Sequence, residues 1–533
     1  MKRLGKHALV ALMFVFLLAQ VAMARPGGGS SFRGGGSSRS TSSGSSSRST
    51  SSGSSSRSTS SSGSSSRSTS SGVIIIPGGS SGSYSGSSGS SSGSSSEGSP
   101  VAGLIILAVF AVIFVVVIWL VIMAASSKNK SWATTVAPLA PPSRPPSARR
   151  ELEKLQQVDP NFSLVLFDDF LVALYTEIRH AHARGTLARY APYLVPEAAQ
   201  GLGHPVAGEL HTVLVGSARI DDVQGIAPGS EWVVVTVGFE TNVAGRGPQG
   251  EVAAYLHETW TLRRRAQARS RTPDKAKVIG CPSCGAPLDV VVAGVCKHCS
   301  QQVSSGAFDW LVVGARIEEQ EARGPMLTGN TEEEGTDFPT VAEPDAQPRF
   351  AALQAQDPAL DWNGLMGRVG LIFSEFQGAW AQRDLARMRP FFSDTIFQVQ
   401  NYWVDEYKRQ GLRNVTENAR IFRTELARVA SDAFYDSVTI RVYAVSQDYT
   451  VADADNRIVS GSREKERTYT EYWTLIRGRG VKGAPHSDKV CPKCGAPLNV
   501  NMAGHCTYCQ TKITTGGFDW VLSRIEQDDV YAG

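Results

Sequence analysis

The sequence lacks the short motifs that mark the common enzyme classes. It has no Walker phosphate-binding loop, and no strand-to-helix turn carries a Gly-x-Gly-x-x-Gly or a Gly-x-Ser-x-Gly pattern. Its nine histidines are scattered, without a His-Glu-x-x-His spacing. A net charge of +4 over 533 residues does not indicate a polyanionic partner. The sequence therefore offers no positive evidence for catalysis, and we predict that the protein is not an enzyme.

Cysteine is confined to two clusters with the same spacing. Each begins Cys-Pro-x-Cys-Gly-Ala-Pro-Leu and ends Cys-x-x-Cys, and together they contain all eight cysteines of the chain. Two such turns facing each other place four thiolates in a tetrahedron, the geometry of a closed structural zinc site, although disulfide pairing is the alternative. We predict two structural Zn²⁺ ions in ribbons at 278–304 and 488–514. The predicted ligands are Cys281, Cys284, Cys296 and Cys299, and Cys491, Cys494, Cys506 and Cys509.

The first 150 residues have few of the features of a packed domain. Residues 1–24 have a basic start, an apolar run and a small-x-small end, which predicts a signal peptide. Residues 25–100 are mainly Ser and Gly and have almost nothing apolar to bury, so they are predicted to be disordered. Residues 101–125 contain no charged residue and are long enough to cross a bilayer as one helix.

The charges on either side of 101–125 predict the membrane topology. Lys128, Lys130 and Arg144 follow this segment, whereas Glu97 is the nearest charge before it. The positive-inside rule then places the C-terminal part in the cytoplasm and the Ser/Gly-rich part outside, in a bacterial inner membrane. Whether the signal peptide is cleaved or retained does not alter this prediction. Because the cytoplasm keeps thiols reduced, the topology favours zinc over disulfides.

The remaining chain contains one domain twice. Residues 126–150 are rich in Pro and Ala, and residues 321–349 are acidic, so both are predicted to be linkers, the second a solvated spacer with an acidic docking segment as the alternative. Between and after them lie 151–320 and 350–533. Matched segments are Leu187–Arg189 with Leu385–Arg387, Glu258–Leu262 with Glu471–Leu475, and Phe308–Trp310 with Phe518–Trp520.

Each copy is predicted to place its helices before its strands. An apolar stripe runs from Phe167 to Ile178 in the first copy and from Met366 to Trp380 in the second, and Thr186 and Asp384 are expected to cap a second helix. The strands are predicted at 212–224, 231–243 and 252–264, and at 420–429, 435–449 and 463–477, with a last strand after each ribbon. This order is typical of an α+β fold. Each ribbon is then expected at the tip of a hairpin.

These segments carry a family resemblance. The Asp-Pro-x-Phe opening, Leu-Ala-Arg, Glu-x-Trp-Thr-Leu-x-Arg and the closing Phe-Asp-Trp-Val-Leu resemble the C-terminal domain of the mitochondrial inner-membrane translocase subunit Tim44. The resemblance covers both copies, about 300 residues. It implies a cone-shaped fold of helices and a curved antiparallel sheet, related to nuclear transport factor two, with a hydrophobic pocket and a role at a membrane. The tandem arrangement and the ribbons depart from the family pattern, so its mitochondrial partners are not carried over.

Candidate sites other than the cysteines are few. If the cone fold holds, the opening helices line a cavity whose expected walls are Phe170, Leu174, Ile178, Phe373 and Phe376. His298 and His505 are weaker alternatives as metal ligands. Asp168 and Asp169 point about 100° apart on a helix, so they are interpreted as a solvated face rather than a catalytic pair.

Two sets of residues that occur in both copies, the glutamates and the tryptophans, are interpreted as structural. Glu177 and Glu375 are expected to pair with an arginine rather than to act as bases. The Trp residues of the last two strands are expected in the core, with ligand stacking as the alternative; they are Trp260, Trp310, Trp473 and Trp520.

The sequence leads to three functional hypotheses. The first is a single-span membrane protein that presents two pocketed, zinc-containing domains as a scaffold, with a polypeptide or lipid as ligand and a role in protein transport or membrane-associated assembly. The second is a small-molecule enzyme of the same fold. The third, nucleic-acid binding through the ribbons, is disfavoured because Lys297, Lys493 and Lys512 form only a thin basic patch. The oligomeric state is not predicted.

Overall fold

The computed structural model describes residues 147–533 except 207–208, 249, 274–278, 323, 325–326, 328–335 and 529. The predicted signal peptide, Ser/Gly-rich region and membrane helix, and the linker as far as residue 146, lie outside the described residues. Within the described residues, no helix combines the length and the apolar character that a membrane span requires. All described residues fall in one compact unit.

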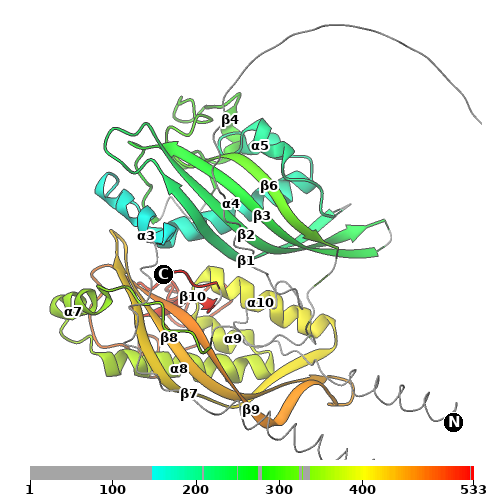
Figure 1. The fold of residues 1–533 in the computed structure, drawn as a ribbon, viewed down its shortest axis with the longest axis vertical. Helices are drawn as coiled ribbons and strands as arrows, with labels where there is room; N and C mark the ends of the chain where they lie inside the picture. The colour runs from blue at the N-terminus through cyan, green and yellow to red at the C-terminus, as the bar shows by residue number, and fades with distance from the viewer. Residues whose placement is uncertain are drawn as a thin grey trace, which may run out of the picture. The chain divides into compact units, whose positions relative to one another are not determined.

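Residues 147–321, here called the first repeat, begin with helices and continue as a sheet (Figure 1). The helical elements are α3 (Ala148–Glu153), η2 (Lys154–Gln157), α4 (Leu164–Ala183), η3 (Leu187–Tyr190) and α5 (Pro196–Gln200). The strands are β1 (Glu209–Gln224), β2 (Trp232–Gly247), β3 (Gly250–Arg265) and β6 (Leu311–Glu321), with η4 (Leu288–Val290), β4 (Val291–Val292) and β5 (Val295–Cys296) in the ribbon.

Local sequence explains the long helix α4. The hydroxyl of Ser163 accepts a hydrogen bond from the backbone N–H of Leu166 and so caps the helix start. The predicted apolar stripe packs against the sheet, and Leu174 and Ile178 are at most 1% exposed. The helix ends before Gly185, whose φ of +68° is costly for other residues.

The first sheet is antiparallel, in the order β1-β2-β3-β6. Strands β3 and β6 pair from Tyr255↔Glu321 to Arg263↔Leu311, so the ribbon lies in the connection of a hairpin, as predicted. Strand β1 shifts its register with β2 at three places, between Leu210 and Thr212, Val215 and Ser217, and Ile220 and Asp222. Such bulges bend an edge strand.

Residues 336–533, the second repeat, have the same order of elements. The helical elements are α7 (Ala346–Gln356), α8 (Trp362–Gln382), α9 (Leu385–Met388), η5 (Arg389–Phe391) and α10 (Asp394–Arg409). The strands are β7 (Leu412–Ser431), β8 (Tyr435–Ala452), β9 (Ile458–Gly478) and β10 (Val521–Gln527), in the sheet order β10-β9-β8-β7. The architecture of both repeats is therefore α+β, as predicted.

Two details of the predicted secondary structure are wrong. The carboxylate of Asp384 does cap α9, but the hydroxyl of Thr186 donates back to the carbonyl of Ala181, and only a single 3-10 turn follows. Helix α10 was not predicted, although Ile396, Trp403 and Tyr407 form a helical apolar stripe. It was missed because the prediction rested on comparing the copies, and the first repeat has only the five-residue helix α5 there.

The acidic segment between the repeats is not a solvated spacer along its whole length. Residues 336–345, here called the strap, lie against the second sheet. Buried Arg441 donates a hydrogen bond of 2.6 Å to the carbonyl oxygen of Phe338. The carboxylate of Glu343 accepts one of 3.0 Å from buried Arg428. The prediction failed because the buried arginines that bind the strap lie about 100 residues further along the chain.

Candidate metal centres and the cavities between the repeats

Both cysteine quartets are assembled in the structure. In each, the four sulfur atoms lie within 4.8 Å of one another. The Sγ–Sγ distance is 3.8 Å for Cys281 and Cys299, and 3.9 Å for Cys491 and Cys509. Four sulfurs at Zn–S distances of about 2.3 Å around a tetrahedral ion are about 3.8 Å apart. The spacing therefore fits a metal ion.

Backbone conformation explains how each turn presents its thiols. Gly285 and Gly495 have φ of +79° and +72°, a left-handed conformation that glycine adopts readily. Their N–H groups donate to the carbonyls of Cys281 and Cys491 at 2.8 and 2.9 Å. The second turns use Ser300 and Gln510 at φ of +59° and +58°, which the sequence pattern did not indicate.

Hydrogen bonds favour the thiolate form of one cysteine in each quartet. The backbone N–H of Gln301 lowers the pKa of Cys299 to about 7. The hydroxyl and backbone N–H of Thr511 lower the pKa of Cys509 to about 6. A thiolate is the ligand that a metal ion requires, so these donors favour the metal-binding form of Cys299 and Cys509, whereas burial raises the pKa of Cys281 and Cys284.

The donor sets are all-sulfur. Neither His298 nor His505 belongs to the groups that the structure brings together, and all eight cysteines are free thiols. Sulfur separations of 3.8 to 3.9 Å exceed the length of a disulfide bond, about 2.05 Å. The two quartets could therefore each hold a metal ion, and four thiolates suit zinc.

The two ribbons contact the rest of their repeats through different side chains. In the second, the guanidinium of Arg389 donates to the carbonyl of Met502 at 2.8 Å, and Lys512 pairs with Asp394 of α10 at 2.6 Å. In the first, the hydroxyl of Tyr193 donates to the carbonyl of Gly280 at 2.7 Å. The second ribbon is therefore linked to α10 by a buried arginine and an ion pair.

The residues predicted to line an internal cavity are packed in the two cores. Leu174, Ile178, Phe373 and Phe376 are at most 3% exposed, and none of them lines the cavity beside Phe170 or the cavities between the repeats. Phe170 reaches a cavity of about 40 Å³, too small for a substantial ligand. Aromatic neighbours pack against three of these positions, Phe170, Phe373 and Phe376.

The four tryptophans common to the repeats lie in the cores, as expected. Trp260, Trp310, Trp473 and Trp520 are at most 3% exposed. The indole N–H of Trp473 donates to the carboxylate of Glu471 at 2.9 Å, and that of Trp260 to Glu258 at 3.4 Å. The repeated Glu-x-Trp segment is therefore a buried hydrogen-bonded pair in both sheets.

Glu258 also belongs to a closed polar network that the sequence did not reveal. It pairs with Arg179 of α4 and accepts a hydrogen bond from Tyr175, and both charged side chains are at most 1% exposed. The hydroxyl of Tyr175 lies 2.9 Å from that of Thr241. Burial, with the Glu258 charge, raises the pKa of Tyr175 far above its ordinary value. The signal in the sequence was the i, i+4 spacing of Tyr175 and Arg179 on one helix face.

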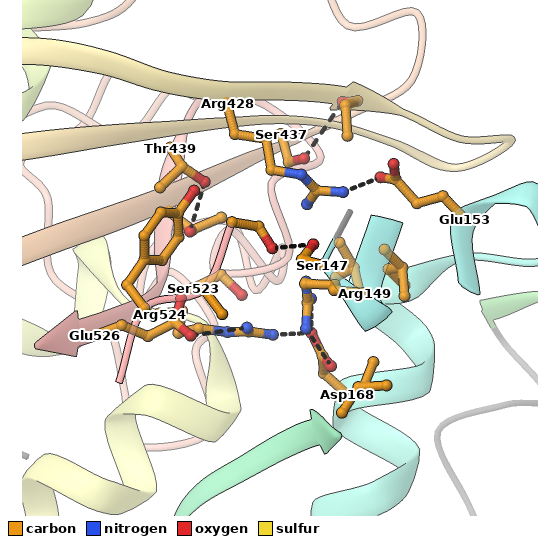
Figure 2. A pocket seen from close by; sticks show the side chains of 18 of the residues that line it. Ser147, Arg149, Glu153, Asp168, Arg428, Ser437, Thr439, Ser523, Arg524 and Glu526 are labelled. Atoms are coloured by element: carbon orange, nitrogen blue, oxygen red, sulfur yellow. Dashed lines mark hydrogen bonds and ion pairs between the residues drawn. The ribbon is translucent and has the colours of Figure 1, made fainter. Parts of the chain in front are cut away.

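Asp168 is not on a solvated helix face, which corrects the sequence interpretation. Its carboxylate pairs with Arg149 near the start of the described chain and with Arg524 on β10 (Figure 2). Burial raises the pKa of Asp168, but the two guanidinium charges outweigh it and hold that pKa below its ordinary value of 3.8. The neighbouring Asp169 accepts a hydrogen bond of 2.6 Å from Thr395 of α10. Both carboxylates therefore join the repeats.

The two glutamates expected to pair with arginine differ. Glu375 accepts hydrogen bonds from Arg387 at 2.8 and 3.3 Å and pairs with Lys489, so the prediction is confirmed there. Glu177 instead accepts a hydrogen bond of 2.6 Å from the hydroxyl of Tyr190, so the prediction is wrong for the first repeat.

Three connected cavities lie between the repeats. The polar one of about 70 Å³ contains the Asp168 cluster and the pair of Arg428 with Glu153 (Figure 2). Next to it is a more apolar cavity of about 140 Å³, here called the apolar cavity, between α4, β1, α10 and β10. An open groove of about 1110 Å³, here called the groove, shares Val172, Val215 and Val399 with the apolar cavity.

Sequence reasoning did not find these cavities. Their walls come from segments that are far apart in the chain, such as Asp168 and Arg524. The walls also include Gln400, on the helix that was not predicted. The amphipathic pattern of α10 was the one local signal that could have located it.

Comparison with known proteins places a family within the second repeat. The model of the Tim44-like domain matches residues 347–486, which run from α7 through β9. Residues 347–486 are a Tim44-like domain. The matched range ends before the second cysteine quartet and β10, so the ribbon is additional to the Tim44-like domain.

Other comparisons add little. No curated protein matches the chain. A solved structure, the intermembrane space region of the chloroplast protein ARC6, is 13% identical and covers 22% of this chain and 88% of its own, with a TM-score of 0.18. That score is too low to support a statement about the fold or the function.

Proposed function

We propose that this protein is a membrane-anchored, non-enzymatic scaffold that binds a polypeptide or lipid ligand in protein transport or membrane-associated assembly. The observation that carries the proposal is the Tim44-like domain at 347–486. We propose that 151–320 and 350–533 both have the cone-shaped fold related to nuclear transport factor two. The repeated order of helices, three long strands, ribbon and last strand supports this assignment.

The proposal includes a membrane anchor and the side of the membrane on which the two repeats lie. The uncharged segment 101–125 and the lysines that follow it support a single span with both repeats in the bacterial cytoplasm. A reducing compartment agrees with two all-cysteine centres that hold structural zinc. In this arrangement zinc stabilises each ribbon, and the ligand binds elsewhere.

The non-enzymatic assignment is supported by the state of the buried carboxylates. Glu258 lies between Arg179 and Tyr175 and has no exposed surface to offer to a substrate. Asp168 is held by two arginines. A general base needs access to the proton that it removes and a pKa near the working pH; Glu258 lacks the access, and the two arginines hold the pKa of Asp168 below its ordinary value. The alternatives remain an enzyme of this fold and a nucleic-acid binder, but Lys512 of the basic patch is already paired with Asp394.

The proposal is tested with the full chain in lipid nanodiscs and loaded with zinc. Binding is measured for a permanently unfolded polypeptide, reduced and carboxymethylated lactalbumin, for the same protein in its native fold, and for vesicles of anionic lipid. We expect binding of the unfolded polypeptide or of the vesicles, and no binding of the folded protein. Absence of binding to both the unfolded polypeptide and the vesicles would contradict the scaffold function.

The topology needs a separate measurement. A thiol reagent that does not cross membranes should leave the cysteines of intact spheroplasts unlabelled, and should label zinc-stripped lysates. Labelling of intact spheroplasts would place the repeats outside the cytoplasm.

A further inference from the structure

The two sheets present their outer strands to the space between the repeats. Strand β1 is the outer strand in the order β1-β2-β3-β6, and β10 is the outer strand in the order β10-β9-β8-β7. Figure 1 shows β1 at the side of the first sheet that faces α10 and β10. Among the described residues, no backbone hydrogen bond joins β1 to any strand other than β2.

The lining of the cavities shows that these edges, rather than the sheet faces, border the space. Consecutive residues of a strand point to opposite faces, so a face can contribute only every second residue. Yet residues 211–219 of β1 line the groove and the apolar cavity without a gap. Residues 523–527 of β10 line the apolar cavity in the same way. Backbone N–H and C=O groups therefore border the space.

A second, independent observation points to a ligand. Gln400 of α10 lines the apolar cavity and is 3% exposed. Its side-chain oxygen is buried and accepts no hydrogen bond from the described residues. A buried acceptor without a donor destabilises the folded protein. A ligand that donates a hydrogen bond at this position would remove that destabilisation.

Size and charge restrict the ligand further. The volume of about 140 Å³ is close to that of an apolar cavity that accommodates benzene, so it suits one aliphatic or aromatic side chain. The walls of the apolar cavity and the groove carry seven carboxylates and four guanidinium groups. A ligand with a net negative charge is therefore disfavoured.

We propose that an extended polypeptide segment adds as a strand to the free edge of β1, with one apolar side chain in the apolar cavity and a hydrogen bond donated to Gln400. Peptide backbone supplies the alternating donors and acceptors that a strand edge requires. Beside the cavities the ladder of β1 with β2 is regular over 212–215 and 217–220, with bulges on either side, so the added strand is short. This inference rests on the proposed scaffold function and assigns the binding site that it lacks.

A segment of this same chain is the competing occupant. Ala322 and Gly324, which follow β6, line the groove, and residues 328–335 continue from there. That segment contains three consecutive glutamates, Glu332, Glu333 and Glu334. Because the walls are already rich in carboxylates, the charge of this segment opposes its entry, and we favour a separate polypeptide.

The test uses the full zinc-loaded chain in nanodiscs and a capped ten-residue peptide of threonine and lysine with one central leucine. Ten extended residues span about 33 Å, enough to cover the regular part of β1. Affinity is measured by fluorescence anisotropy, and the position of binding by hydrogen exchange of strand amides. We expect binding to protect β1 amides and to leave those of β7, the opposite edge in the second sheet, unchanged. The same peptide methylated at alternate backbone nitrogens should bind at least about tenfold more weakly.

Two variants test whether the apolar side chain of the peptide enters the apolar cavity. Gln400→Leu removes the acceptor at similar volume and should weaken binding about tenfold. Val399→Phe fills the boundary of the apolar cavity and the groove and should weaken binding by a similar factor. Val295→Phe, on the exposed ribbon, is the matched control and should leave the affinity unchanged.

Other outcomes would contradict the binding site, the scaffold function or the nature of the occupant. Binding that is insensitive to N-methylation or to both variants, or that protects β7 instead of β1, overturns the site while leaving the scaffold function intact. Failure of the nanodisc-bound chain to bind any unfolded polypeptide removes this inference, and removes the scaffold function as well if anionic vesicles also fail. If deletion of 328–335 exposes β1 amides that were protected without peptide, the chain's own segment is the occupant and the proposal is wrong.

Discussion

Asp168 on the first long helix forms an ion pair with Arg524 on the last strand, across 356 residues of chain. Arg149 completes the cluster from the other side. The carboxylate therefore links the start of the described chain, the first repeat and the second repeat at one point. Because its side chain is 20% exposed, the cluster is largely shielded from solvent.

Replacement of Asp168 should loosen the contact between the repeats. Asp168→Asn removes the carboxylate partner of Arg149 and leaves Arg524 with Glu526 alone, and we expect a loss of about 1–3 kcal/mol in the free energy of unfolding, measured by urea titration. Lys154→Gln, at an exposed pair with Glu151, is the control and should change stability by less than about 0.5 kcal/mol. Equal losses in the two variants would contradict a special role for Asp168.

The same carboxylate predicts a pH dependence. Its folded pKa lies below the ordinary value of 3.8, so it contributes stability at pH values above that number. The contribution is lost as the pH falls below about 4, towards the folded pKa. The difference in unfolding free energy between the native sequence and Asp168→Asn should therefore shrink as the pH is lowered from 5 to 3. A constant difference over this range would show that the effect is not electrostatic.

Metal content should follow the quartets one by one. The full chain should contain two zinc ions, and Cys284→Ser should lose one of them, because a serine hydroxyl is a poor replacement for a thiolate ligand. Since β3 pairs with β6 outside the ribbon, the first sheet should remain folded. Atomic emission gives the zinc content, and circular dichroism reports the sheet. Global unfolding of the first repeat would contradict the independence of the ribbon.

The attachment of the second ribbon should depend on Arg389. Arg389→Ala removes the hydrogen bonds to the carbonyls of Met502 and Phe392, each 2.8 Å long. We expect faster amide exchange over 501–514 with retention of both zinc ions. Exchange in the first ribbon, at 288–304, should not change and serves as an internal control. Loss of zinc from the second quartet would mean that the attachment, rather than the quartet alone, determines metal affinity.

Truncation of the core should separate packed positions from the one beside a cavity. Phe376→Ala should cost about 3–5 kcal/mol, because the side chain is 1% exposed and contacts Phe392 and Trp473. Phe170→Ala should cost less, since a cavity of about 40 Å³ adjoins it. Thermal or urea unfolding measures both values. A larger loss for Phe170→Ala would contradict this assignment of the cavity.

Local patterns predicted the α+β order, the hairpin that contains each ribbon and the metal-ligand quartets, because each depends on residues close in sequence. The apolar stripe of α4, for example, follows from the helical spacing of Phe167, Phe170 and Leu174. The predictions that are wrong concern residues whose interaction partners lie far away in the chain. Asp168 looked solvated because nothing near it in the chain indicates Arg524, and the strap looked like a spacer because Arg428 and Arg441 follow much later.

The position of the ribbons also records the order of two events in the history of the gene. In both repeats the quartet occupies the connection to the last strand, and that strand begins twelve residues after the fourth cysteine, at Leu311 and at Val521. Two separate insertions would not be expected to choose the same hairpin and keep the same exit length. The shared position therefore favours an ancestor with a single domain that already carried one cysteine quartet, followed by tandem duplication. Present-day descendants of that ancestor with one domain should carry their four cysteines in this hairpin.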